Sequence, residues 1–361
     1  MIDPDRILRT FTELAGIDSP SGHEEAIAAE LRSRFSELGF SVQRDSYGNV
    51  IASEDGDDPL LLSAHMDTVE PGRGIVPIRN GDRLETDGST IVGGDCKAGI
   101  TTILEALQSI KDGATARSPV QVVISREEEL GLRGAKNLDF SMVRAREAVV
   151  FDGEGPVYHI ASGSPTYLRY DVEVTGRAAH AGVEPEKGIS AIRIAAEIIA
   201  ELPNGRLDAE TTFNVGMVSG GSVRNAVPEH ATFSGESRSH NQATLEGQRI
   251  VIENTLTAAR QRHPEAMVVV EFHIEFEAYK LDPESGIVRS VTKSLGSMGL
   301  EPEFAMSGGG TDGNVFRSHG VQSVVLGVAA HNAHTVREYV DLNELEQAAR
   351  FCEQLLLHRT D

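Results

Sequence analysis

Four apolar segments of this chain each run directly into side chains that can bind metal ions. The segments are LLLSAHMD, VVISREEELG, EAVVFDG and VVLGVAAHNAH, and a further acid, Asp95, lies in GGDCKAG. Short buried strands that deliver His, Asp and Glu at their ends build a site at the carboxyl edge of an α/β sheet. Because the set combines imidazole with carboxylate, it suits zinc, cobalt or manganese and predicts a metal-dependent hydrolase.

His65 and the run Glu127, Glu128 and Glu129 are the most informative of these groups. A ligand role for His65 is favoured over a structural one because Asp67 can hydrogen-bond its other ring nitrogen. A run of acids is usually solvated surface, but this one lies between an apolar strand and LGLRGA. At least one carboxylate is therefore expected to turn into the site. Neighbouring acids can divide the work, one binding metal and one acting as general base.

Size and composition limit the classes of protein to consider. A length of 361 residues exceeds the usual single core, so two domains are expected, and 40% hydrophobic with 24% charged residues is typical of a globular protein. The formal charge of −22 argues against nucleic acid or an anionic membrane as partner. The first residues lack the basic and apolar regions of a secretory signal, and only Cys96 and Cys352 are present. A cytoplasmic protein without a disulfide framework is expected.

The elements that must position these residues begin with two helices. Asp3 and Pro4 are a start signal for the first helix. Ser21 with Glu24 predicts a capping box for the second, whose apolar stripe ends at Gly39. Strands follow at about 41–53 and 60–65, then a hairpin near Asn80 and Gly81, the helix AGITTILEALQSI and the strand VQVVIS. The order strand, helix, strand is that of a βαβ unit, and it predicts an α/β domain with a mixed, mostly parallel sheet flanked by helices.

After Gly163 the pattern changes. The order becomes strand, helix, two strands, helix and strand, which predicts an inserted α+β domain of ferredoxin-like topology. The helix SGIVRSVTKSLGSMG and the strand ending at Ala329 then return to the first domain. The expected boundaries are 1–165 and 279–361 for the catalytic domain and 166–278 for the insert.

Seven motifs make the pattern specific. HMDTVEPGRG, GGDCKAG, EEELG, FDGE, GRAAHAGVEPEKGISAI, NAVPEHATFSGESRS and GGGTDGN resemble, in order and spacing, the dinuclear zinc peptidases that include peptidase T, carboxypeptidase G and the aminoacylases. The similarity covers nearly the whole chain and is greatest to the peptidase T-like branch. It implies a zinc exopeptidase-like catalytic domain with two Zn²⁺ per subunit, Co²⁺ or Mn²⁺ being alternatives.

The resemblance also implies a role for each residue of the metal site. His65 and Asp152 would bind one metal, Glu129 and His334 the other, and Asp95 would bridge them. Glu128 would be the general base that takes a proton from a bridging water, with Asp67 orienting His65. Glu127 in place of Glu128, and His331 in place of His334, are alternatives.

In the insert, the resemblance points to residues that reach the substrate. His180 would stabilise the oxyanion from the lid of a partner subunit, which implies a homodimer formed through the lid. Asn225 and Arg238 would hold substrate, Arg238 by a bidentate grip on a carboxylate. Outside the insert, Gly309 and Gly310 would line the pocket.

One departure from the family pattern is Cys96, where peptidase T-like sequences more often carry Asp or Asn. Successive side chains usually point apart, so packing without metal ligation is expected for this thiol. The predicted function is a metal-dependent exopeptidase for short peptides, with a tripeptide aminopeptidase as the leading hypothesis. The alternatives are an amidohydrolase or deacylase, or a carboxypeptidase, built on the same metal site.

Overall fold

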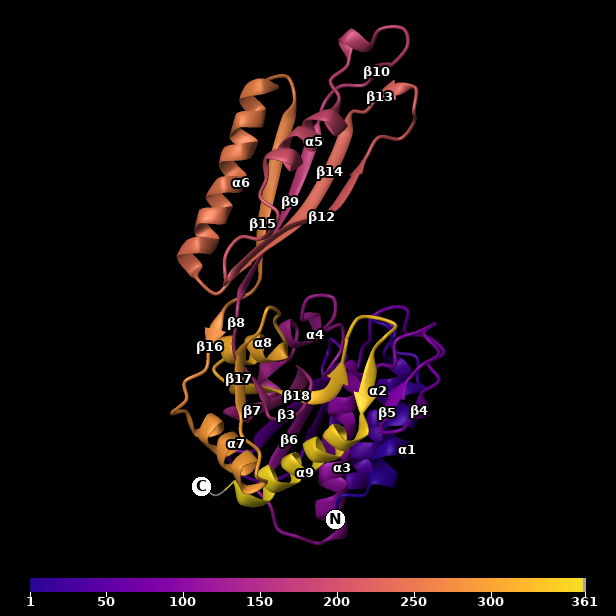
Figure 1. Ribbon diagram of the computed structural model, residues 1–361, viewed down its shortest axis with the longest axis vertical. Helices are drawn as coiled ribbons and strands as arrows, with labels where there is room; N and C mark the ends of the chain where they lie inside the picture. The colour runs from indigo at the N-terminus through magenta and orange to yellow at the C-terminus, as the bar shows by residue number, and fades with distance from the viewer. Residues whose placement is uncertain (360–361) are drawn as a thin grey trace. The chain divides into compact units, whose positions relative to one another are not determined.

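The computed structural model describes residues 1–359 and divides into two compact units (Figure 1). Unit 1 contains Met1–Gly163, Lys280–Ser307 and the chain from Thr311 onward, and unit 2 contains Ser164–Tyr279 with Gly308–Gly310. Unit 1 is therefore built from chain segments that precede and follow unit 2 in the sequence. No helix in the described part of the chain is long and apolar enough to cross a membrane.

A mixed sheet of 12 strands forms the middle of unit 1. Its order is β1-β2-β6-β3-β7-β18-β19-β5-β4, with β8 paired to β16, β17 and β18. The four central strands, β6, β3, β7 and β18, run parallel to one another. The strands are β1 (Ser41–Arg44), β2 (Val50–Ser53), β3 (Leu60–His65), β4 (Ile78–Asn80), β5 (Arg83–Glu85), β6 (Val120–Ser125), β7 (Glu147–Glu154), β8 (His159–Ser164), β16 (Tyr279–Lys280), β17 (Glu303–Met306), β18 (Gln322–His331) and β19 (Tyr339–Asp341).

Every residue of β3 and β6 is buried, so both faces of the sheet centre are covered. This explains why these strands read as continuous apolar runs rather than as alternating ones. Helix α3 packs on β3, β7 and β18, and α1 and α9 pack on α3. Phe316 of α8 belongs to a separate buried cluster with Leu61 and Val123. The helices are α1 (Pro4–Ala15), α2 (Glu25–Leu38), α3 (Gly94–Asp112), α4 (Arg133–Lys136), α7 (Gly286–Ser297), α8 (Asp312–Ser318) and α9 (Leu342–His358), with a 3₁₀ turn at Phe140–Met142.

Two local predictions at the start of the chain have different outcomes. The predicted start of α1 is confirmed, because the side chain of Asp3 accepts hydrogen bonds from the first backbone N–H groups of the helix. The predicted capping box of α2 is wrong. The hydroxyl of Ser21 donates instead to Asp67 at 2.7 Å, and buried Glu24 pairs with Arg126 at 2.7 Å. Both side chains support the strand ends rather than the helix.

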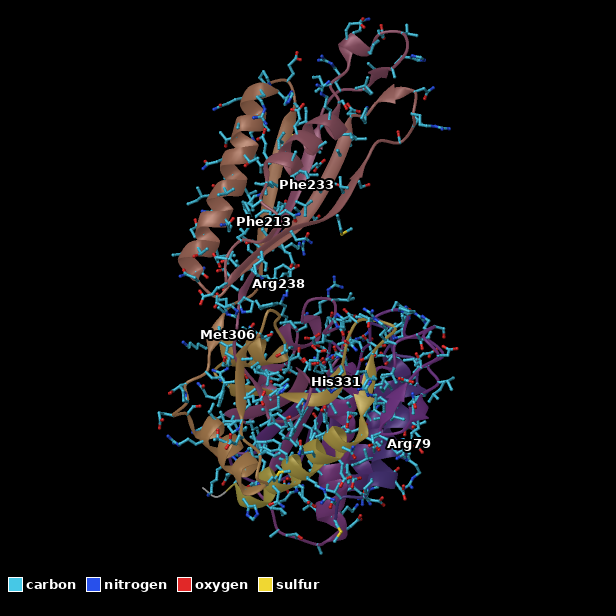
Figure 2. The ribbon with its side chains drawn as sticks, in the orientation of Figure 1. Arg79, Phe213, Phe233, Arg238, Met306 and His331 are labelled. Carbon is cyan, nitrogen blue, oxygen red and sulfur yellow. The ribbon has the colours of Figure 1, made fainter. Side chains whose placement is uncertain are left out.

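Unit 2 is an α+β layer whose antiparallel sheet has the order β11-β12-β14-β9-β15. Helices α5 and α6 pack against this sheet (Figure 1), and Phe213 and Phe233 lie in the core between them (Figure 2). The placement of β9 between β14 and β15 is that of a ferredoxin-like fold. Both parts of the predicted fold class are thereby confirmed. The elements are β9 (Thr166–Thr175), β10 (Ala179–His180), a 3₁₀ turn at Pro185–Lys187, α5 (Ala191–Glu201), β11 (Gly205–Arg206), β12 (Thr211–Gly220), β13 (Ala226–Val227), β14 (His230–Ser239), α6 (Gln242–Arg262) and β15 (Met267–Phe276).

The centre of β14 leaves no room for a side chain at Gly235. A Cβ atom there would lie 2.2 Å from the carbonyl oxygen of Asn214 and 2.2 Å from the hydroxyl of buried Tyr170. We expect Gly235→Ala to destabilise unit 2 by about 1–3 kcal/mol, measured as the free energy of urea unfolding. The matched control is Gly247→Ala in α6, where a Cβ meets nothing within 4 Å. It should instead stabilise the helix by up to about 1 kcal/mol, and equal effects of the two changes would contradict the steric argument.

Candidate metal centre

The carboxyl ends of the four central parallel strands meet at one edge of the sheet. His65 is the last residue of β3 and pairs in register with Ser125, the last residue of β6. Asp152 lies near the end of β7, and β18 ends at His331, three residues before His334. Since β6, β3, β7 and β18 are neighbours, segments far apart in the sequence bring their polar residues to one place.

Asp95 joins two groups of potential ligands. Its Oδ1 atom lies 3.0 Å from Nε2 of His65, and its Oδ2 atom lies 3.3 Å from Nε2 of His334. His65 is also 3.3 Å from Asp152, and His334 is 3.0 Å from Glu129. In each group the ligand atoms lie within 4.8 Å of one another, as a bound metal ion requires. The structure thus brings all five sequence-predicted ligands into two adjoining groups, with one carboxylate between them.

Asp67 is a buried carboxylate that supports both His65 and the loop after β6. Its oxygens accept hydrogen bonds from the backbone N–H groups of Glu128 at 3.0 Å and Glu129 at 3.2 Å, and from the hydroxyl of Ser21. The Nδ1 atom of His65 lies 3.4 Å from the Asp67 carboxylate and 2.9 Å from the Asp67 carbonyl oxygen. The second ring nitrogen therefore faces Asp95 and Asp152. Asp67 fixes the imidazole and the acidic loop at the same time.

Glu128 is 8% exposed and groups with His65 and Glu129 within ligand distance. Burial, together with the nearby charge of Asp152, raises the pKa of Glu128 well above its usual value. A carboxylate with a raised pKa is suited to accept a proton near neutral pH. Glu127 has different surroundings, because its carboxylate accepts a hydrogen bond from Tyr47 at 2.7 Å and lies 3.4 Å from Arg126.

His331 and His334 are also clearly distinguished. His331, labelled in Figure 2, lies 2.7 Å from Glu344 and stacks on Tyr339 with ring centroids 4.7 Å apart. His334 has a left-handed backbone with φ of 64° and a 54% exposed side chain. Its imidazole faces the carboxylates of Asp95 and Glu129, whose hydrogen bonds raise the pKa of His334 to about 10.

The closely packed carboxylates of the centre would be stabilised by bound cations. Burial raises the pKa of Asp152 to about 6 and that of Asp312 to about 7. Burial lowers the pKa of His65, but the neighbouring carboxylates more than offset this and hold it well above its usual value. Carboxylates and imidazoles packed this closely are the donor set of divalent zinc, cobalt or manganese. The residues present therefore fit two adjoining metal ions.

Cys96 lies beside this centre. Its Sγ atom donates to the carbonyl oxygen of Phe151 at 2.6 Å, yet it also falls in one group with His65, Asp95 and Asp152. Burial raises the pKa of the Cys96 thiol well above its ordinary value, which favours the neutral thiol over a ligating thiolate.

Two buried acids that support the centre, Glu338 and Asp312, were not among the predicted site residues, although Asp312 lies in the motif GGGTDGN. Glu338 accepts hydrogen bonds from the backbone N–H groups of Val92, Gly93 and Asp95 at 2.8–3.0 Å, and so fixes the approach to the shared carboxylate. Asp312 accepts a hydrogen bond from the hydroxyl of Ser125, at the end of β6. Glu338 lies in the polar stretch TVREYVD, where no periodicity separates a buried acid from a solvated one.

The predicted insert residues His180, Asn225 and Arg238 lie in unit 2, and unit 2 also contains Gly309 and Gly310 from the loop that follows the insert in the chain. Exposed His180 is in β10, and the carbonyl oxygen of Asn225 accepts a hydrogen bond from the N–H group of Ala181 at 3.0 Å. Arg238 is at the opposite end of unit 2 from β10 (Figures 1 and 2). Within this unit, His180 and Arg238 are therefore not brought together.

The loop around Gly309 has a fixed backbone. The hydroxyl of Ser164 donates to the carbonyl oxygen of Gly309 at 2.9 Å. A Cβ atom at Gly310 would lie 2.5 Å from the ring of Phe276. Arg238 donates to the carbonyl oxygen of Gly308 at 3.2 Å and pairs with Glu236 at 3.0 Å.

Comparison with known proteins shows which family this chain belongs to. Residues 163–263 match the peptidase dimerisation domain of the M20 peptidases, and residues 49–155 match peptidase family M28. The chain is 35% identical to the uncharacterized protein YqjE of Bacillus subtilis (strain 168), over 97% of both chains. The chain belongs to the M20 family of metallopeptidases.

Two solved structures of M20 peptidases extend this result. The aminopeptidase PepT from Bacillus cereus ATCC 10987 is 33% identical, with a TM-score of 0.85 over 99% of this chain and 98% of that one. A tripeptidase from Staphylococcus aureus subsp. aureus mu50 is 32% identical, with a TM-score of 0.90 over the same shares. The predicted enzyme class, a metallopeptidase, is confirmed, and the match to the dimerisation domain falls on unit 2.

Proposed function

We propose that this M20 peptidase is a tripeptide aminopeptidase that removes the first residue of short peptides. The observation that carries the proposal is buried Glu128, which lies within ligand distance of His65 and Glu129 beside the shared carboxylate Asp95. The similarity to an aminopeptidase PepT and to a tripeptidase, at 33% and 32% identity over nearly the whole chain, supports the choice of substrate.

His65 and Asp152 would hold one divalent cation, Glu129 and His334 the other, and Asp95 both. We propose zinc as the native metal, with cobalt or manganese as substitutes. Such cations supply Lewis-acid polarisation of the scissile carbonyl and lower the pKa of water toward neutrality. Asp67 keeps His65 in the orientation and tautomer that ligation needs, because Nδ1 faces the Asp67 oxygens.

Glu128 would perform the proton transfers. Its carboxylate takes a proton from the water that attacks the scissile carbonyl carbon. The same proton then passes to the nitrogen of the leaving group as the C–N bond breaks, so that Glu128 returns to its starting charge. The backbone N–H bond from Glu128 to Asp67 fixes the loop from which this side chain acts.

Unit 2 would act as lid and dimerisation domain, and the enzyme would be a homodimer. Strand β10, which contains His180, and Arg238 lie at opposite ends of unit 2 (Figures 1 and 2), which supports a site that takes these two residues from different subunits. His180 would donate to the oxyanion, while Asn225, Arg238, Gly309 and Gly310 would contact the peptide. The cytoplasmic location expected from the sequence stays a prediction.

A panel of substrates tests this function. We expect zinc-loaded enzyme to cleave free-amine tripeptides, with a kcat/KM at least about 10-fold above that for dipeptides, measured by release of the first amino acid. N-acetylated tripeptides should not be cleaved. Turnover of N-acyl amino acids without peptide cleavage would instead favour a deacylase, and release of the last residue would favour a carboxypeptidase.

A further inference from the structure

Glu154 lies where two segments that carry potential metal ligands meet. It ends β7, two residues after Asp152, and its Oε1 atom accepts a hydrogen bond from the backbone N–H of Asn332 at 2.8 Å. Asn332 in turn precedes His334 by two residues. Since an extended chain advances at most about 3.6 Å per residue, the Cα atom of Glu154 lies within about 7 Å of that of Asp152. The hydrogen bond from Asn332 thus holds the carboxylate between the segments that bear Asp152 and His334, a position called here the rim of the metal centre.

The backbone at Glu154 is firmly held. Glu154 pairs with Ala330 of β18, and the next residue exchanges two hydrogen bonds with that strand. Gly155 donates to the carbonyl oxygen of Ala330 at 2.8 Å and accepts from the N–H of Ala329 at 2.7 Å. The side chain thus projects from a fixed base, as recognition of a small ligand group requires.

The charge of Glu154 has no cationic partner within residues 1–359. Its side chain is exposed, and no Lys, Arg or His in this range forms an ion pair with it. Two other acids of this region differ in this respect, because Glu127 lies 3.4 Å from Arg126 and Glu70 lies 2.7 Å from Arg73. Glu154 therefore offers a carboxylate oxygen to a positive group from solution.

We infer that Glu154 binds the α-ammonium group of the peptide and thereby selects free amino termini. The inference rests on the aminopeptidase function proposed above. In a substrate cut after its first residue, the α-nitrogen is two bonds from the scissile carbonyl carbon, so it must lie at the rim of the centre. An exposed, fixed carboxylate at that rim, next to the segments bearing Asp152 and His334, has the charge and position for this group.

Glu154→Gln tests the inference because glutamine keeps an acceptor for the Asn332 N–H and removes the charge. We expect the KM for a free-amine tripeptide to rise about 10- to 100-fold with kcat changed less than about 3-fold. The KM for the same peptide with a hydroxyl in place of the amine should not change. Zinc content, measured by atomic absorption, should stay at two ions per chain. Glu284→Gln, at an exposed acid before α7, is the matched control and should leave both KM values unchanged.

An unchanged KM for the free-amine peptide would overturn the inference, and an equal rise for both peptides would assign Glu154 to the support of the His334 loop alone. Binding of both peptides is measured in parallel by calorimetry in a Glu128→Gln background. A chain that cleaves no tripeptide refutes the proposed function, while the affinity difference between the two peptides still decides the role of Glu154.

Discussion

Glu128→Gln is expected to lower kcat for tripeptide hydrolysis by about 10²- to 10⁴-fold while the chain keeps its metal ions. Glutamine has nearly the same shape but cannot accept the proton of the attacking water. The backbone N–H of residue 128 would still donate to Asp67, so the loop that also carries Glu129 should hold its place. The measurements are kcat on a tripeptide and metal content after gel filtration.

The adjacent acid provides a matched control. In Glu127→Gln, the glutamine oxygen can still accept the hydrogen bond that Tyr47 donates at 2.7 Å. This variant should keep kcat within about 3-fold of the wild type. If Glu127→Gln were the inactive variant and Glu128→Gln the active one, the general base would have been assigned to the wrong carboxylate.

Removal of the metal ions is expected to destabilise unit 1 increasingly as pH rises from about 5 to 8. Without metal ions, the carboxylates of the centre remain packed together. Among the described residues that could bind metal, only His65 and His334 can carry a compensating positive charge. At pH 8 we expect stripped protein to melt roughly 5–10 °C below protein with saturating zinc, measured by scanning calorimetry. The difference should be smallest near pH 5.

The direction of this pH dependence follows from the raised pKa values. Asp152, at about 6, and Asp312, at about 7, hold protons in the folded state that the unfolded chain releases near pH 4. Their stabilising contribution is complete below pH 4 and is lost as pH rises through 6 and 7. His334, with its pKa raised to about 10, adds a loss in the same direction above pH 6.5.

The lowered pKa values of Asp67 and Asp95 act in the opposite direction, but their contribution is already complete at pH 5. Asp152→Asn removes one of the buried acids and should flatten the profile of the stripped protein. A melting temperature of stripped wild type that does not fall between pH 5 and 8 would contradict this account.

The site residues that are most predictable from the sequence are metal-binding side chains that directly follow an apolar strand. His65, Asp152 and the acids after Ser125 follow continuous apolar runs, and such runs are typical of parallel strands buried on both faces. Their carboxyl ends then have to meet at one edge. The fold of the insert is predictable for a related reason, because strands such as β9 alternate buried and exposed residues along their length.

Residues whose role depends on distant partners were less predictable. Ser21 and Glu24 have the spacing of a capping box, but their partners, Asp67 and Arg126, are more than 40 residues away in the chain. Glu338 acts by accepting three backbone N–H groups, and a single sequence carries no signal for such a contact. Long-range hydrogen bonds of this kind are set by tertiary packing rather than by local pattern.

The position of unit 2 within the chain also sets an order of events during synthesis. β7 reaches its neighbour β18 only after the whole of Ser164–Tyr279 has been made. Until Gln322–His331 emerges from the ribosome, one edge of β7 has no strand to pair with, and His334 is absent from the metal centre. Unit 2, whose pairing strands are continuous in the chain, can complete its sheet earlier. A nascent chain therefore has an unpaired, apolar strand edge with which other chains can associate. Two metal ions can be bound only after the segment that carries His334 has been synthesised.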